Sequence, residues 1–243
     1  MPDARAPTGR HFVVTCEHAS AAVPAPLRGL GLPAAILRSH HAFDVGALPA
    51  ARALAKVCRA PLHLGKWSRL VVDLNRSEDH PKVIARRVGE RTVPGNQLTP
   101  EEHEARIDHL WRPYRTAVEH AASTAAATGT CLHFSVHSFT ERLNGVERRN
   151  DIGLLFDPRR PRERDVVEAL RRHLVTTGLS VRLNFPYFGH TDGMTSHLRA
   201  RLPAARYLGI EVELNQRLAR TTAGQRRLAH ALIAAVQALD LET

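Results

Sequence analysis

The feature that most constrains the fold of this chain is the alternation of short apolar runs with stretches of helical periodicity. The apolar runs have the length of strands and lie at residues 11–16, 61–64, 69–73, 131–137, 151–156, 180–184 and 206–214. Strands that alternate with helices along a chain assemble into a mainly parallel sheet covered by helices. The sequence therefore predicts an α/β fold.

Four of the intervening stretches carry specific helix signals. They span residues 44–59, 99–128 and 162–177, with the last beginning at Thr222. The second opens with Thr-Pro-Glu-Glu, a capping box with proline at the first helical position. Residues 75–98 are polar and contain two prolines and two glycines, so we expect a long surface excursion there, which could serve as a lid.

Length and composition bound the class of protein. A chain of 243 residues without repeats or an evident linker predicts a single domain over residues 1–243. No apolar run approaches the ~18 residues that a membrane span needs, and the first residues do not resemble a signal peptide. Three widely spaced cysteines, Cys16, Cys58 and Cys131, favour a reducing cytoplasm over a disulfide framework.

The chain carries a formal charge of +10, with 34 Lys+Arg against 24 Asp+Glu. Nucleic-acid binding is one interpretation of that excess. However, the basic residues are mostly arginines spread along the chain, and 5% aromatic content offers few platforms for stacking bases. We therefore expect no nucleic-acid partner, and an arginine-rich surface that attracts small anionic substrates.

Polar side chains gather where the predicted strands end. His18 and Glu17 follow the first run, and His137 ends the run at 131–137. Ligands of parallel sheets bind beyond the carboxyl ends of the strands, so the two histidines can converge there. In the last run, Glu211 and Glu213 are two residues apart and share a face.

These residue types fit a metal-dependent hydrolase. Zinc takes histidine and carboxylate ligands, and a nearby glutamate can accept a proton from the water that zinc activates. Arginine can hold a substrate carboxylate through two parallel hydrogen bonds. Plainer explanations exist for single residues: His18 could be a turn histidine, and Asp73 and Arg76 a structural ion pair. Neither GxSxG nor a P-loop occurs in the chain.

Seven short blocks, in order and over nearly the whole chain, resemble those of the N-formylglutamate amidohydrolase family. The first is Cys-Glu-His-Ala-Ser, followed by Val23-Pro24, and the second has the form H-x-A-x-D-x-G-A. The blocks begin at residues 16, 40, 69, 136, 149, 184 and 209. A single block has little specificity, but seven in sequence are characteristic of the family.

The resemblance implies a fold similar to that of zinc carboxypeptidases, a three-layer α/β/α arrangement around a mixed, mostly parallel sheet. It also implies a zinc-dependent amide hydrolase. His18 and His137 resemble the two histidine ligands of those peptidases. Glu213 resembles their catalytic glutamate, and Glu211 is the competing choice.

The third metal ligand is where the sequence departs from the pattern. Carboxypeptidases place a ligand glutamate three residues after the first histidine, and here that position is Ala21, which cannot bind metal. Asp44 is our choice, because the second block offers no other evident reason for a carboxylate after His40. Glu17 is the alternative, although its side chain would normally point away from that of its neighbour His18.

The implied substrate is N-formyl-L-glutamate, a small anionic N-acyl amino acid, hydrolysed to formate and glutamate in cytoplasmic histidine degradation. Arg76 is the first candidate to bind the substrate carboxylate, and Arg69 and Arg149 are the next candidates. Asn75 would orient the amide or fix Arg76. The alternatives are another N-acyl amino acid, a peptide-like amide, or a non-catalytic binding protein on the same fold. The metal loaded and the oligomeric state are left open by the sequence.

Overall fold

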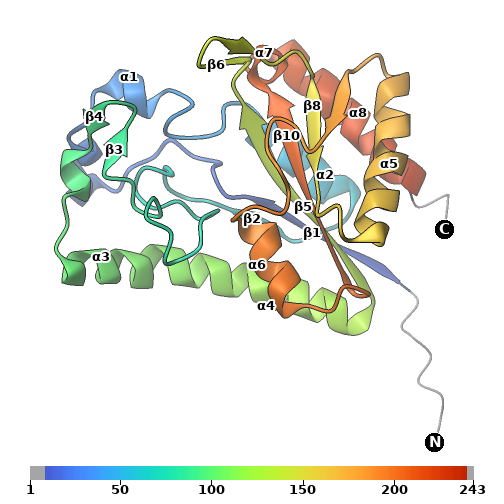
Figure 1. The fold of residues 1–243 in the computed structure, drawn as a ribbon, viewed down its shortest axis with the longest axis horizontal. Coiled ribbons are helices and arrows are strands. Elements are labelled where there is room, and N and C mark those ends of the chain that lie inside the picture. The colour runs from blue at the N-terminus through green and yellow to red at the C-terminus, as the bar shows by residue number, and fades with distance from the viewer. Residues whose placement is uncertain (1–8, 240–243) are drawn as a thin grey trace, which may run out of the picture.

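A computed structural model describes residues 9–239, and its centre is a six-stranded sheet (Figure 1). The strand order is β2-β1-β5-β10-β8-β9. The strands are β1 (Arg10–Cys16), β2 (Leu62–Leu64), β5 (Thr130–Phe139), β8 (Ile152–Leu155), β9 (Val181–Leu183) and β10 (Tyr207–Asn215). Neighbouring strands run parallel except β10 and β8, which are antiparallel. The mixed, mostly parallel sheet is therefore confirmed.

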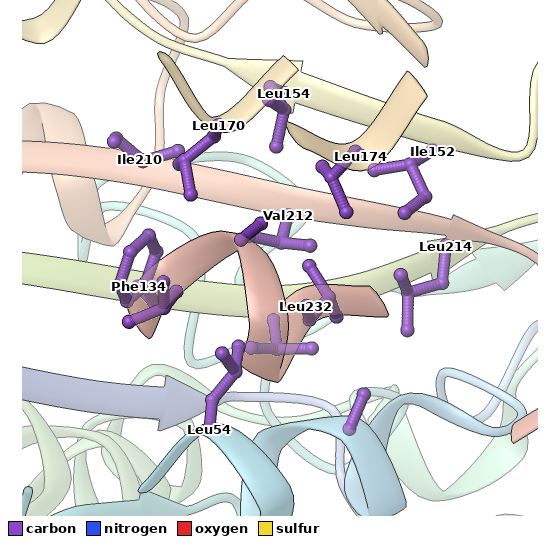
Figure 2. Packing of buried hydrophobic residues seen from close by; sticks show 14 of the residues in the cluster. Leu54, Phe134, Ile152, Leu154, Leu170, Leu174, Ile210, Val212, Leu214 and Leu232 are labelled. Carbon is purple, nitrogen blue, oxygen red and sulfur yellow. The ribbon is translucent and has the colours of Figure 1, made fainter. Parts of the chain in front are cut away.

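Helices cover both faces of this sheet, as the predicted three-layer fold requires. One face packs against α2 (Ala47–Val57), α5 (Pro161–Thr176) and α8 (Thr222–Leu239). The other face packs against α4 (Arg112–Thr128) and α6 (Met194–Arg201). Figure 2 shows the first interface, where strand residues such as Phe134 and Val212 meet Leu170 and Leu232 from the helices.

The two faces differ in chemistry because side chains alternate along a strand. In β5, Leu132, Phe134 and Val136 are buried in the larger apolar core. The alternate positions, Cys131, His133, Ser135 and His137, turn to the other face and become polar toward the carboxyl end of the strand. In β10 the same alternation separates Ile210 and Val212 from Glu211 and Glu213. Parallel pairing then sets His137 beside Glu213.

The predicted helices are present, with one local difference. The stretch at 99–128 comprises α3 (Pro100–Arg106), the π-helical segment η3 (Ile107–Trp111) and α4. The wider turn precedes Pro113, whose ring and missing N–H disfavour an ordinary α-helical turn. The capping box at Thr99 forms as expected. The short segments η1 (Ala25–Gly31), α1 (Ala34–Leu37), α6 and α7 (Gln216–Ala219) were not predicted.

The strand predicted at 69–73 is wrong, because residues 69–71 form a turn and residues 72–73 belong to no regular element. Leu70, Val71 and Val72 are buried, as their apolar character indicated, but side chains satisfy carbonyl groups here in place of a neighbouring strand. Asn96 Nδ2 donates to Leu70 O at 2.8 Å, and Arg106 Nη1 donates to Val71 O at 3.4 Å. The apolar residues at 69–73 therefore indicate burial and not an extended strand.

Residues 75–98 leave the sheet region and pack partly on themselves. They contain the hairpin β3 (Arg87–Val88) and β4 (Arg91–Thr92) and the turn η2 (Pro94–Asn96). Val83 and Ile84 are buried in a cluster with Ile107 and Trp111, and Val93 is buried in another with Leu30. Figure 1 shows β3 and β4 beside α1, on the left and away from α5 and α8. A second hairpin joins β6 (Arg142–Leu143) to β7 (Val146–Glu147).

No helix within residues 9–239 combines the length and the apolar character needed to cross a membrane.

Candidate metal centre

A polar pocket of about 200 Å³ lies at the carboxyl ends of β1, β5 and β10, the edge where the sequence predicted a site. Its walls come from the strand ends, the start of the excursion and the segment that follows β9. It is lined by His18, Asp44, Arg69, Asp73, Asn75, Arg76, His137, Ser138, Tyr187, Thr191, Asp192, Glu211 and Glu213.

His18, Asp44 and His137 converge in this pocket, with one potential ligand atom from each lying within 4.8 Å of the others. His137 Nδ1 is 2.8 Å from Asp44 Oδ2, and His18 Nδ1 is 3.4 Å from the same oxygen. His18 follows β1, His137 belongs to β5, and Asp44 precedes α2. All three side chains are buried. The structure thus brings together the three residues that we expected to bind metal.

Local backbone structure explains how Asp44 reaches the histidines. Its N–H donates to His18 O at 2.9 Å, which ties the two loops together. Gly46 follows with φ +79°, in the left-handed region that favours glycine. A Cβ at that position would overlap the carbonyl oxygen of Ala219 in α7. Glycine therefore allows both the turn and the close approach that hold Asp44 in place.

A carboxylate supports His18 from behind. His18 Nε2 donates to Asp73 Oδ1 at 2.7 Å, which leaves Nδ1 as the electron-pair donor toward the pocket. Burial would raise the pKa of Asp73, but the neighbouring His18 and Arg69 lower it well below its usual range. Arg76 pairs with Asp192, so the ion pair that we considered between Asp73 and Arg76 is not the arrangement found. Sequence reasoning missed this role of Asp73.

His137 is supported in a similar way. Its Nε2 lies 2.9 Å from Ser135 Oγ and 3.2 Å from Glu17 Oε2, and Ser135 donates to Glu17 at 2.9 Å. Burial would lower the pKa of His137, but hydrogen bonds to Asp44 and Glu17 raise it well above its usual value. Although burial opposes it, His137 also lowers the pKa of Glu17 to about 2. Glu17 thus lies behind His137, away from the three converging atoms.

The donor set fits a zinc ion. Two imidazole nitrogens and one carboxylate oxygen form the kind of three-ligand shell that catalytic zinc sites use. In such sites the second nitrogen of each ligand histidine normally bonds to a carboxylate, a carbonyl or water. His18 has Asp73 in that position, and His137 has Ser135 with Glu17.

The two glutamates of β10 differ in their partners. Glu211 accepts a hydrogen bond from Thr195 Oγ1 at 2.7 Å, whereas buried Glu213 Oε2 has no hydrogen-bond partner within residues 9–239. Burial raises the pKa of Glu213 to about 8; His137 opposes the shift, and the charge of Asp44 adds to it. Glu213 therefore has one carboxyl oxygen without a hydrogen-bond partner within residues 9–239, and the pKa of its carboxyl group is near neutrality.

The four residues predicted to bind substrate are in different settings. Arg69 Nη2 donates to Asp44 Oδ1 at 2.7 Å and contacts His18 Nδ1, so it belongs to the cluster itself. Arg76 lines the pocket, and Asn75 lines it while accepting from Met194 N at 2.7 Å. Arg149 is not brought to the site: its side chain is 85% exposed and pairs with Glu147.

The segment after β9 supplies Tyr187, Thr191 and Asp192, none of which sequence reasoning assigned to the site. Tyr187 lies in one of the family-like blocks, whereas Thr191 and Asp192 lie in an irregular turn before α6. No periodic pattern marks this part of the sequence, so only the folded chain places them.

Comparisons with known proteins identify the family of this chain and proteins of similar structure. A model of the N-formylglutamate amidohydrolase family matches residues 10–220. The gene product Atu2144 from Agrobacterium tumefaciens is similar in structure, with a TM-score of 0.83 and 32% identity over 96% of this chain and 92% of that one. An N-formylglutamate amidohydrolase from Ralstonia eutropha JMP134 has a TM-score of 0.76 and 21% identity, over 98% and 97% of the two chains. A search of curated proteins found no match.

Proposed function

Because the chain belongs to the N-formylglutamate amidohydrolase family, we propose that it is a metal-dependent enzyme that hydrolyses the amide bond of a small N-acyl amino acid. The observation that carries this proposal is the convergence of His18 Nδ1, His137 Nδ1 and the Asp44 carboxylate. Glu213 lines the same pocket, and its Oε2 has no hydrogen-bond partner within residues 9–239.

His18, His137 and Asp44 would hold one zinc ion. When bound, zinc supplies a Lewis acid that polarises the amide carbonyl and lowers the pKa of water toward neutrality. The buried cluster already contains the deprotonated carboxylate that such an ion requires, since the pKa of Asp44 is well below its usual range. Burial alone would raise that pKa, but Arg69 and His18 outweigh it.

Glu213 would act as general base and then as general acid. Its free oxygen can accept a proton from the water that attacks the acyl carbon, and can then donate that proton to the leaving amide nitrogen. The C–N bond breaks, and the products are a carboxylic acid and an amino acid. A pKa close to neutrality suits a group that must both take up and release a proton.

The first substrate to test is N-formyl-L-glutamate, which the family name suggests. A pocket of about 200 Å³ suits a ligand of this size. Arg76 would contact the side-chain carboxylate of this substrate at the mouth, while Arg69 would stabilise charge close to Asp44.

Two substitutions test the assignment together. We expect His137→Ala to lose both bound zinc and hydrolysis of N-formyl-L-glutamate. Glu213→Gln should retain zinc while kcat falls about 10²–10⁴-fold, the usual contribution of a general acid–base. Zinc content would be measured by mass spectrometry after dialysis, and hydrolysis by release of formate.

His230→Ala is the matched control, because it removes an exposed histidine in α8, outside the pocket. Normal zinc content and turnover in His137→Ala would refute the metal assignment. Stoichiometric zinc in the wild-type protein without turnover of any N-acyl amino acid would instead indicate a binding protein.

A further inference from the structure

Arg76 and Asp192 form an ion pair at the mouth of the pocket, and this pair bears on which substrates the site accepts. Their side chains are 39% and 31% exposed, and Arg76 Nη1 lies 3.8 Å from Asp192 Oδ2. Both residues line the pocket that contains the candidate metal ligands. The substrate would therefore meet a positive and a negative group side by side. A site that binds only anions would present positive groups without the carboxylate.

The Asp192 carboxylate is fixed in this position. Ser77 N donates to both of its oxygens, at 3.1 and 3.2 Å. Beside it, Asn75 Oδ1 accepts from Met194 N, which joins the same two loops a second time. Asp192 therefore cannot swing out of the mouth without breaking hydrogen bonds between segments more than 100 residues apart in the sequence.

The charges in the pocket leave little capacity for a second substrate carboxylate. The two arginines of the lining are Arg69 and Arg76, and Arg69 is already bonded to Asp44. Five carboxylates line the same pocket: Asp44, Asp73, Asp192, Glu211 and Glu213. Arg76 is therefore the one arginine of the lining that is left for a second substrate carboxylate, and Asp192 already shares it.

We infer that Asp192 makes the site favour N-acyl amino acids whose side chain ends in a carboxamide, as in glutamine, over those that end in a carboxylate, as in glutamate. This inference rests on the proposed function and names its preferred substrate class. A carboxamide can accept from Arg76 through its oxygen and donate to Asp192 through its nitrogen. A carboxylate can only accept, and it brings a second negative charge close to Asp192.

N-formyl-L-glutamine and N-formyl-L-glutamate provide the test, because they have nearly the same shape and differ in side-chain charge. For the zinc-loaded enzyme we expect kcat/KM to be about tenfold higher for the glutamine derivative. In Asp192→Asn this ratio should fall to about one, mainly through a lower KM for the glutamate derivative. The side-chain oxygen of the introduced asparagine can still accept from Ser77 N, so the loop should keep its structure.

Asp79→Asn is the matched control, since it removes the same charge from an exposed neighbouring loop position outside the pocket lining. It should leave the ratio unchanged. A measurement on the wild-type enzyme needs no variant: the ratio should shrink as salt rises, because a partly exposed charge is screened.

The possible outcomes separate this inference from the proposed function. Hydrolysis of both substrates at equal rates, or a preference for glutamate that Asp192→Asn does not change, would overturn the role of Asp192 and leave the amidohydrolase intact. If the zinc-loaded protein hydrolysed neither compound nor any other N-acyl amino acid, the proposed function itself would fail.

Discussion

The two histidines of the candidate centre present the same ring nitrogen, Nδ1, to Asp44, and each has its other nitrogen bonded to a group behind it. His18 Nε2 donates to Asp73, whose charge is partly buried, while His137 Nε2 meets Ser135 and Glu17. These outer contacts fix the tautomer and the ring orientation before any ligand binds, and they raise the basicity of the nitrogen that faces the pocket.

We expect Asp73→Asn to weaken zinc binding about 10–100-fold. Asparagine can still accept from His18 Nε2, but it lacks the negative charge that strengthens this bond. Affinity would be measured by competition with a chromophoric chelator. Asp165→Asn, at an exposed position of α5, should leave affinity unchanged. Wild-type affinity in Asp73→Asn would show that Asp73 only packs against the ring.

At the scale of elements, the site depends on how α2 and α7 meet the strand ends. Asp44 precedes α2, and the turn through Gly46 passes so close to Ala219 that no side chain fits between them. Asn215 ends β10 and caps α7 by accepting from Arg217 N at 2.9 Å. The position of Asp44 is thus set by packing between two helix termini, one of which comes from the far end of the chain.

We expect Gly46→Ala to lower the free energy of unfolding by about 2–3 kcal/mol more than Gly145→Ala does, as measured by urea denaturation. Both glycines have φ +79°, so a left-handed φ disfavours alanine at both positions. Only at Gly46 does the added methyl group meet backbone, since nothing lies within 4 Å at Gly145. Equal losses in the two variants would show that the close approach of α7 is unimportant.

Across the whole molecule, a buried hydrogen-bonded chain runs along the polar face of the sheet. Tyr207 Oη lies 2.7 Å from His133 Nδ1, and His133 Nε2 lies 2.9 Å from Thr15 Oγ1. These three side chains are fully buried and come from β10, β5 and β1. Burial lowers the pKa of His133 to about 4, so folding favours its neutral form.

This shift makes stability depend on pH. The unfolded chain binds a proton at His133 with a pKa of about 6.5, and the folded protein binds it only near pH 4. The contribution of neutral His133 to the free energy of unfolding is therefore fully present above about pH 6.5. It is lost as pH falls toward 4, by up to about 3 kcal/mol.

We expect His133→Gln to show a smaller loss of unfolding free energy between pH 7 and pH 4 than the wild-type protein. Glutamine does not titrate, although its amide can still reach polar neighbours. Urea denaturation at a series of pH values would measure the difference. The control His230→Gln removes an exposed histidine and should keep the wild-type slope. An unchanged slope in His133→Gln would refute a neutral buried His133.

Much of the fold and part of the site could be predicted from residues alone. Alternation of apolar runs with helical stretches indicated the α/β class, and all predicted strands except 69–73 exist. Alternation within β5 and β10 already separated apolar from polar positions, because successive side chains on a strand point to opposite faces. The strand-end positions of His18 and His137 and the family-like blocks pointed to the cluster that the folded chain forms.

Tertiary structure alone decided which other residues lie behind that cluster, which lie at the mouth of its pocket and which lie outside it. Asp73 and Glu17 lie behind the histidines, Asp192 enters the mouth from a segment more than 100 residues away from Ser77, and Arg149 stays outside. The physical reason is that local sequence sets secondary structure and the face on which a side chain lies. Contacts between distant loops depend instead on strand register and on the packing of helix ends, which no local pattern encodes.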